Sequence, residues 1–181
     1  MLDVVVSVII ITLSFQVLPA ALGIDQNKGL NQTIWFALLL LLGQGLMFLF
    51  GFLLGERFMH LMENFKGIVI FLGFFLIGIR MIFEAFVVRK GERTYTFDST
   101  MPVILASLAQ GINTFLAGLI LTYLPFERQW LTIILTIATL IITGIGTMMK
   151  PGKSSFSFAS FLFLLGGFWM IFSSIYLGFF Y

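Results

Sequence analysis

Six apolar segments, each about 20 residues long or slightly longer, constrain this chain more than any other feature of its sequence. A helix of that length crosses the hydrocarbon core of a bilayer with some tilt. With 60% hydrophobic and 10% charged residues, the chain has more apolar sequence than a soluble domain of its size needs. We therefore predict an all-α polytopic membrane protein with six transmembrane helices. The segments are, roughly, Val4–Ile24, Thr33–Leu54, Gly67–Val88, Met101–Leu124, Trp130–Met149 and Phe156–Phe179.

The composition excludes several classes of function. The absence of cysteine excludes disulfides and thiolate metal sites, and the single histidine, His60, excludes a metal centre built from histidines. A net charge of +2 is too small to indicate a nucleic-acid partner. The sequence has no recognisable nucleophile–base pair or metal triad, so we expect neither an enzyme nor a cofactor. The N-terminus lacks the basic region and the cleavage signature of a signal peptide, and we expect the first segment to be retained as a span.

Basic residues are unevenly divided between the two sets of alternate loops. The first, third and fifth connections carry six lysines and arginines, whereas the second and fourth carry three and both tails carry none. Because basic residues concentrate in cytoplasmic loops, both termini are predicted to lie outside and the loop at about 89–100 to lie in the cytoplasm. The six are Lys28, Arg89, Lys90, Arg93, Lys150 and Lys153; the three are Arg57, Lys66 and Arg128.

The two halves of the chain contain similar short stretches. Gly78-Ile79-Arg80-Met81-Ile82-Phe83 in the third segment matches Gly167-Phe168-Trp169-Met170-Ile171-Phe172 in the sixth, and Gln16 in the first corresponds to Asn113 in the fourth. Because three spans is an odd number, two such halves must cross the membrane in opposite directions. Inverted repeats with polar positions near the midplane are typical of transporters. The alternative is that a short motif recurs by chance in an apolar, phenylalanine-rich chain. We predict one transmembrane domain, 1–181, with repeats at about 1–88 and 101–181.

Four carboxamides lie inside the apolar segments at comparable depth: Gln16, Gln44, Gln110 and Asn113. Hydrocarbon offers these side chains no hydrogen-bond partner, so they face a bundle interior or a wet cavity. Any one of them is explained by hydrogen bonding between helices. Three spans with amides at matching depth favour a shared binding site for a solute. Gln110 and Asn113 are three residues apart, so they share one helix face.

Pro19 follows Gln16 by three residues and cannot donate a backbone hydrogen bond. We expect it to kink the first helix and to free the carbonyl of Phe15 beside the Gln16 side chain. Amide and carbonyl would then offer two oxygen acceptors at one depth. A simple kink without a binding role is the equal alternative.

Arg80 and Glu84 are the charged residues most deeply placed within the apolar segments. They lie four residues apart, so one helix face brings them together as an ion pair. The pair either locks the bundle or gates its inner mouth, where Arg80 also reaches toward the interface. Small residues in three segments are expected to mark close helix contacts. They are Gly43, Gly45, Gly51, Gly55, Gly73, Gly78, Gly144 and Gly146.

The whole chain resembles the bacterial manganese efflux pump family, MntP, within the wider group of LysE-like exporters. The resemblance is clearest at Phe75–Glu84, which is similar to the family's G-x-R-M-I-x-E segment, and at Ala138-Thr139-Leu140-Ile141. The family's S-x-D-A motif falls on Ser14-Phe15-Gln16-Val17, with a second copy at Gly111-Ile112-Asn113-Thr114. This resemblance implies six spans in two inverted repeats and Mn²⁺ efflux across the bacterial inner membrane.

The chain departs from the family at the acidic positions. Gln16 and Asn113 replace two aspartates and Gln44 replaces a glutamate, so these three residues are the candidate metal ligands. An amide offers a hard cation only a dipole, and Mn²⁺ prefers hard oxygen ligands. Two alternatives stay open: an exporter of the same fold for a neutral or anionic solute, and a membrane protein that kept the scaffold without transport. The expected partners are the lipid bilayer and a small solute; the sequence leaves the oligomeric state open.

Overall fold

The computed structural model describes residues 1–25, 29–92 and 95–180, and every regular element among them is helical. Two residues of the loop-charge pattern, Lys28 and Arg93, lie outside these ranges. The elements are α1 (Leu2–Ser14), η1 (Phe15–Val17), α2 (Leu18–Ala21), α3 (Leu30–Phe58), η3 (Met59–Phe65), α4 (Lys66–Arg89), α5 (Thr100–Leu121), α6 (Arg128–Met148) and α7 (Lys153–Phe180). The predicted all-α class is confirmed.

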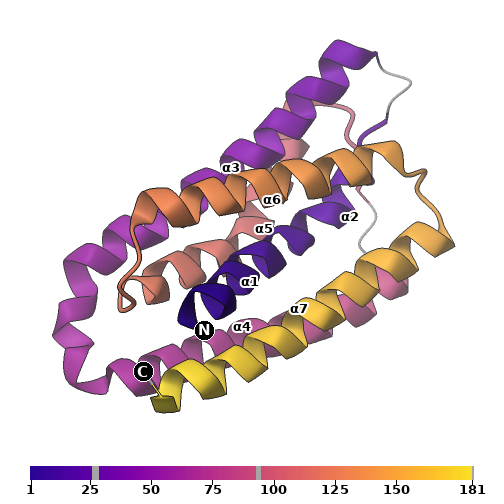
Figure 1. Ribbon diagram of the computed structural model, residues 1–181. Helices are drawn as coiled ribbons and strands as arrows, with labels where there is room; N and C mark the ends of the chain where they lie inside the picture. The colour runs from indigo at the N-terminus through magenta and orange to yellow at the C-terminus, as the bar shows by residue number, and fades with distance from the viewer. Residues whose placement is uncertain (26–28, 93–94, 181) are drawn as a thin grey trace.

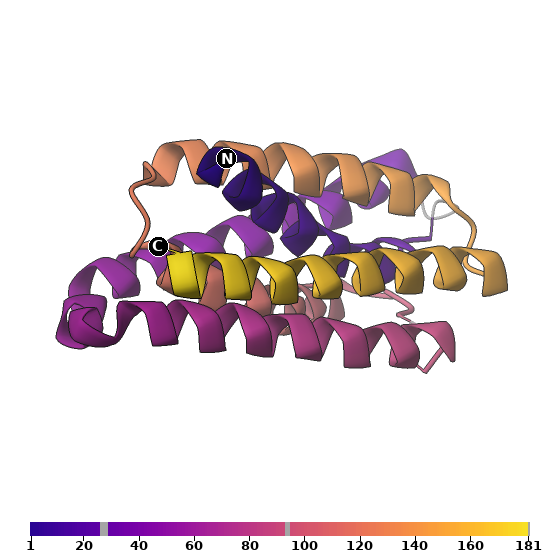
Figure 2. The same ribbon diagram turned by 60° about the horizontal axis from the view of Figure 1, so that its bottom comes forward.

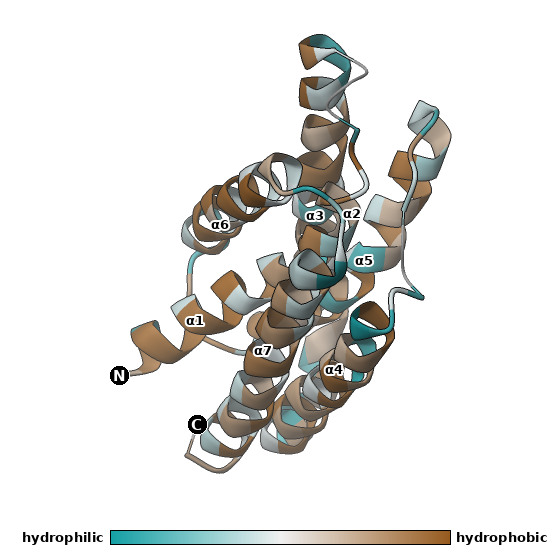
Figure 3. Cartoon of the chain, turned by 90° about the vertical axis from the view of Figure 1, so that its right-hand side faces the viewer, coloured by the Kyte–Doolittle hydropathy of each residue, from teal (hydrophilic) through white to brown (hydrophobic). Residues whose placement is uncertain are grey.

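Five helical stretches are long and apolar enough to cross a membrane: Leu2–Ala21, Leu30–Arg89, Thr100–Leu121, Arg128–Met148 and Lys153–Phe180. Figure 3 shows apolar residues along the length of each. The second stretch has 60 residues and contains α3, η3 and α4. Met62 in η3 has non-helical dihedral angles, and the chain turns back there so that α4 leaves in a different direction from α3 (Figure 1). The protein is therefore a helical membrane protein, and its division into six crossings stays a prediction.

Glycines bring α3 and α5 into close parallel contact. A Cβ atom added to Gly43 would lie 1.7 Å from the Ser107 hydroxyl oxygen, and one added to Gly51 would lie 2.0 Å from the Phe115 carbonyl oxygen. Both helices advance by eight residues between these two contacts, so the helices run in the same direction. Only the absence of a side chain allows this approach.

Helices α4 and α7 form the second close pair and run antiparallel (Figure 2). A Cβ atom added to Gly78 would lie 2.7 Å from the Gly167 carbonyl oxygen, and one added to Gly67 would lie 2.8 Å from that of Gly178. The two copies of the G-x-x-M-I-F stretch therefore begin opposite each other across this interface.

Most of the glycines predicted to mark close contacts do so. Gly55 approaches α5, Gly73 approaches Ile120, and Gly146 approaches Ala21. The prediction is wrong for Gly45 and Gly144, because a Cβ atom at either position would meet nothing within 4 Å. Helix rotation explains the difference: the 100° step between neighbouring residues turns these two glycines away from the neighbouring helices.

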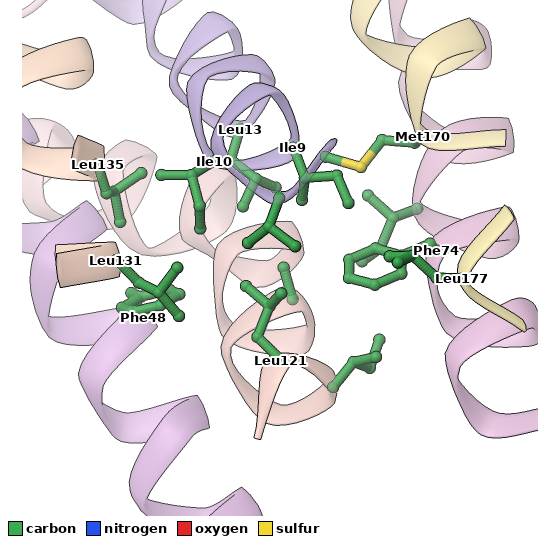
Figure 4. Packing of buried hydrophobic residues seen from close by; sticks show 14 of the residues in the cluster. Ile9, Ile10, Leu13, Phe48, Phe74, Leu121, Leu131, Leu135, Met170 and Leu177 are labelled. Carbon is green, nitrogen blue, oxygen red and sulfur yellow. The ribbon is translucent and has the colours of Figure 1, made fainter. Parts of the chain in front are cut away.

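Helix α1 lies at the centre of the bundle. Its side chains Ile9, Ile10 and Leu13 are fully buried (Figure 4). They belong to one apolar cluster with residues from every other long helix: Phe48, Phe74, Leu121, Leu131, Leu135, Met170 and Leu177. An 18-residue apolar stretch within Leu2–Ala21 is 72% buried inside the protein, against 33% for the corresponding stretch within Leu30–Arg89. A polar group on α1 is therefore shielded from the surrounding hydrocarbon.

Candidate functional site

Three polar side chains from three different elements are hydrogen-bonded in the interior. Gln16 comes from η1, Gln44 from α3 and Thr114 from α5, and all three are buried. The side-chain nitrogen of Gln16 donates to the side-chain oxygen of Gln44 at 3.2 Å and to the Thr114 hydroxyl. The Thr114 hydroxyl in turn donates to the Gln44 carbonyl oxygen at 2.6 Å. We call these three residues the amide cluster.

Local features of the sequence place each member of the amide cluster. Gln16 lies in a single 3₁₀ turn between α1 and α2, three residues before Pro19 in the first turn of α2. Gln44 follows Gly43, whose close approach to Ser107 draws α3 against α5. Thr114 then faces Gln44 across that narrow interface. The cluster therefore depends on a helix interruption and on one glycine contact.

The expected free carbonyl of Phe15 is not present. In the 3₁₀ turn, the Phe15 carbonyl accepts the backbone N–H of Leu18, so Pro19 does not leave it unbonded. Tighter winding to i+3 replaces the bond that Pro19 cannot make. The helix is interrupted at the position that Pro19 predicts. The prediction of a second, unbonded oxygen acceptor beside Gln16 is wrong.

Asn113 lies beside Arg80. The Arg80 guanidinium donates to the Asn113 side-chain oxygen at 3.0 Å and to the Glu84 carboxylate at 3.1 Å. The predicted Arg80–Glu84 ion pair is thus present, with 34% of the Arg80 side chain and 15% of the Glu84 side chain exposed. Since Asn113 and Thr114 are neighbours, this ion pair adjoins the amide cluster along α5.

Several polar atoms in this region have no hydrogen-bond partner in the described part of the chain. They include the side-chain oxygens of Gln16 and Gln110 and the side-chain nitrogen of Gln44. Buried polar atoms are usually paired, because an unpaired one in an apolar interior costs about 1–3 kcal/mol. Unpaired acceptors and an unpaired donor at one depth are what a site for a polar solute would contain.

The sequence prediction overlooked Thr114. A threonine in a membrane helix commonly bonds to its own backbone, so its residue type carries little signal. Its position directly after Asn113, within the second copy of the repeated motif, was the available indication. Thr114, not Asn113, is hydrogen-bonded to Gln16 and Gln44.

The described residues contain no preformed cluster of metal-binding side chains. Within residues 1–25, 29–92 and 95–180, no group of three histidine, aspartate or glutamate side chains is placed to hold a metal ion. The oxygens of the amide cluster are neutral, and they would stabilise a dehydrated divalent cation less than carboxylates would.

A cavity of about 730 Å³ lies at one end of the bundle. Its lining comes from the segments around Gly23, Phe97 and Lys150, which are the connections predicted to be cytoplasmic, and it includes Pro19. Leu18 and Leu22 belong to a buried apolar cluster beside it. These side chains lie just beyond Gln16 in the chain, between the amide cluster and this end.

A second cavity of about 500 Å³ lies at the opposite end, where η3 approaches the segment after α5. Its lining includes Glu56, Glu63, Glu127 and Tyr123. The Tyr123 hydroxyl donates to the Met59 carbonyl at 2.9 Å. Burial raises the pKa of the Tyr123 phenol, and the Glu63 carboxylate raises it further.

Comparison with known proteins identifies the family. Residues 27–177 match the family Mntp, described as "Putative manganese efflux pump". The chain belongs to the Mntp family. A relative with the name "Putative manganese efflux pump MntP", from Fusobacterium nucleatum subsp. nucleatum, is 27% identical over 130 residues, which are 70% of this chain and 71% of the relative. No solved structure matches the chain.

The predicted family resemblance is therefore confirmed. The Mntp match includes Gln44, Arg80 and Asn113, whereas Gln16 lies before its first residue.

Proposed function

We propose that this protein is a six-span exporter in the bacterial inner membrane, with Mn²⁺ as the substrate that membership of the Mntp family supports. The observation that carries the proposal is the buried amide cluster. It joins both halves of the chain at positions of the repeated motif and lies inside the bundle, while each end of the bundle has a cavity. Such an arrangement suits a site that opens alternately to either side.

Helix packing supports the two inverted repeats, with α1, α3 and α4 equivalent to α5, α6 and α7. Inversion about an axis in the membrane plane would make the α3–α5 contact equivalent to an α6–α1 contact, and α6 does pack along α1. Gly43 lies in the α3–α5 contact, and Gly146 of α6 approaches Ala21 of α2, which continues the first span after α1. The same axis would relate α4 to α7, which meet through Gly78 and Gly167. We propose repeats at about 1–88 and 101–181, joined by a cytoplasmic loop at about 89–100.

In this proposal, Gln16, Gln44 and Gln110 bind the solute through their unpaired polar atoms. Asn113 connects that site to the ion pair, because it accepts a hydrogen bond from Arg80. The Arg80–Glu84 pair lies in α4 and bonds to α5, so it links the last helix of the first repeat to the first helix of the second. Movement of one repeat against the other must change this link, which makes it a gate.

A second candidate function is export of a neutral or anionic solute by the same fold. Its support is the absence of an acidic side chain from the amide cluster, in the part of the chain that the structure describes. Neutral donors and acceptors bind neutral solutes without a charge to compensate, and Arg80 would be the counter-ion of an anion. A membrane protein that keeps the scaffold without transport is the remaining alternative.

Transport in proteoliposomes tests these alternatives. Purified protein is reconstituted and assayed with Mn²⁺, other divalent cations, and neutral and anionic solutes, beside the variant Gln16→Asp/Gln44→Glu/Asn113→Asp. If the neutral cluster limits metal binding, the variant binds Mn²⁺ more tightly than the parent, and its binding depends on pH because the metal displaces protons. Strong Mn²⁺ transport by the parent, unchanged in the variant, would show that amides at these positions are adequate for the metal. No transport of any solute would contradict the proposed function.

Membrane orientation is tested separately. A reporter fused after Tyr181 is expected outside the cell, because the basic residues predict that both termini lie there. A second reporter inserted after Gly91, in the α4–α5 loop, is the matched control and is expected in the cytoplasm. Cytoplasmic signal at Tyr181 would reverse the assignment of the two cavities to the two sides.

A further inference from the structure

Helix α6 contains five threonines that fall into two groups. Thr132, Thr136 and Thr147 donate their hydroxyls to backbone carbonyls three or four residues earlier in the same helix, which is the usual arrangement for threonine in a membrane helix. Thr139 and Thr143 are fully buried, and neither hydroxyl has a hydrogen-bond partner within the described chain. Each could satisfy its hydroxyl locally, as the other three do, yet neither does.

The face of α6 that carries Thr139 and Thr143 packs against the first helix around Gln16. A Cβ atom added to Gly146 would lie 2.4 Å from the Ala21 Cβ atom, which fixes the register of α6 against α2. Helix α6 also packs against η1, the turn that carries Gln16, and against α3, which carries Gln44. Thr139 and Thr143 precede Gly146 by seven and three residues, so they share its face and lie toward the level of Gln16. Leu140, which directly follows Thr139 and points about 100° away from it, is 58% exposed.

From this placement we infer that Thr139 and Thr143 form a further polar wall of the translocation pathway, supplied by the second repeat, and that their hydroxyls contact the solute. Helix α6 is the proposed counterpart of α3, so these hydroxyls take the place in the second repeat that Gln44 takes in the first. The inference rests on the proposed function, because it extends the same site. Unpaired hydroxyls persist in an apolar interior only if something else uses them.

The chemistry of this polar wall limits the class of solute that can bind there. A hydroxyl is both a donor and an acceptor and carries no charge. With the unpaired oxygens of Gln16 and Gln110, the two threonines add neutral oxygen ligands for a small hydrophilic solute. A hard cation that keeps part of its water shell fits this class, since first-shell waters can bridge to neutral oxygens.

Cysteine accessibility tests the inference without knowledge of the solute. The natural chain has no cysteine, so Thr139→Cys and Thr143→Cys each introduce a single thiol. In proteoliposomes, both variants are expected to react with a charged, water-soluble methanethiosulfonate reagent, because a pathway admits water. The matched controls are Leu140→Cys on the exposed face of the same helix and Leu135→Cys in the buried apolar cluster. Both controls are expected to resist the reagent, since an apolar environment suppresses the reactive thiolate.

A second measurement separates solute contact from a structural role. Thr139→Val and Thr143→Val keep the side-chain shape and remove a hydroxyl that has no partner, so they are expected to unfold at the parent's temperature or above it. Mn²⁺ transport by these variants is expected to fall at least about tenfold, which is what the loss of one solute contact worth about 1.4 kcal/mol produces. Thr139→Ser and Thr143→Ser are expected to restore it.

The outcomes are distinct. Cysteines at 139 and 143 that label no faster than those at 135 and 140 overturn the inference, whatever the transport result. Valine variants that lose transport only because they unfold at lower temperature also overturn it, because the hydroxyls would then be structural. Labelling at 139 and 143 with no Mn²⁺ transport by the parent supports the wall and contradicts the proposed metal substrate.

Discussion

Thr114 connects the amide cluster, so its hydroxyl can be tested by replacement with valine. The Thr114→Val variant keeps the side-chain volume, and it removes the acceptor of a bond from Gln16 and the donor of a bond to Gln44. Hydrogen bonds between membrane helices average about 0.6 kcal/mol and reach about 1.7 kcal/mol. Two of them predict a loss of about 1 to 3 kcal/mol in the free energy of unfolding.

That loss is large enough to measure by thermal unfolding in detergent. For a protein of this size, each kcal/mol corresponds to about 2–4 °C in the midpoint, so the variant is expected to unfold about 2 to 12 °C below the parent. The matched control is Thr139→Val, which makes the same chemical change at a buried hydroxyl with no partner and is expected to cause no loss.

Thr114→Ser provides a second control. Serine keeps the hydroxyl, so it is expected to retain more stability than valine despite the missing methyl group. If Thr114→Val unfolds at the parent's temperature, the hydroxyl does not bridge the two glutamines in the folded protein. If Thr139→Val loses as much stability as Thr114→Val, the distinction between paired and unpaired hydroxyls is wrong.

Three further substitutions test the ion pair and the helix contacts. Glu84→Gln removes the anion beside Arg80 and leaves its guanidinium bonded only to the neutral Asn113 oxygen. A charged arginine at mid-helix depth costs about 2.5–3.5 kcal/mol, and Arg80 is 34% exposed, so the variant is expected to lose at most about 3 kcal/mol in the free energy of unfolding. Unfolding like the parent would show that the pair does not contribute. Gly51→Ala places a Cβ atom 2.0 Å from the Phe115 carbonyl oxygen and is expected to cost about 1–3 kcal/mol or more in detergent unfolding. At Gly45 a Cβ atom meets nothing within 4 Å, so Gly45→Ala is expected to raise the free energy of unfolding by about 0.5–1 kcal/mol through helix propensity. Equal effects at Gly45 and Gly51 would contradict the α3–α5 register.

The sequence by itself determined the class of the protein, the approximate helix positions and the family. Apolar segments of span length can be read along the chain, because hydrocarbon forces each segment to satisfy its own backbone as a helix. The Arg80–Glu84 pair was equally predictable, since a spacing of four residues brings two side chains together on any helix. These features depend on neighbours in sequence, so no tertiary information was needed.

Only the tertiary structure decided which polar groups meet. Gln16 and Thr114 are 98 residues apart in the chain, and their bond depends on how α5 is rotated about its own axis. The same rotation turns the adjacent Asn113 toward Arg80, because neighbouring residues on a helix point about 100° apart. The sequence shows that α6 carries five threonines, but the packing of α6 against the first helix decides that Thr139 and Thr143 are buried without a partner. Helix rotation is set by the fit of side chains across interfaces, and periodicity along one chain does not encode that fit.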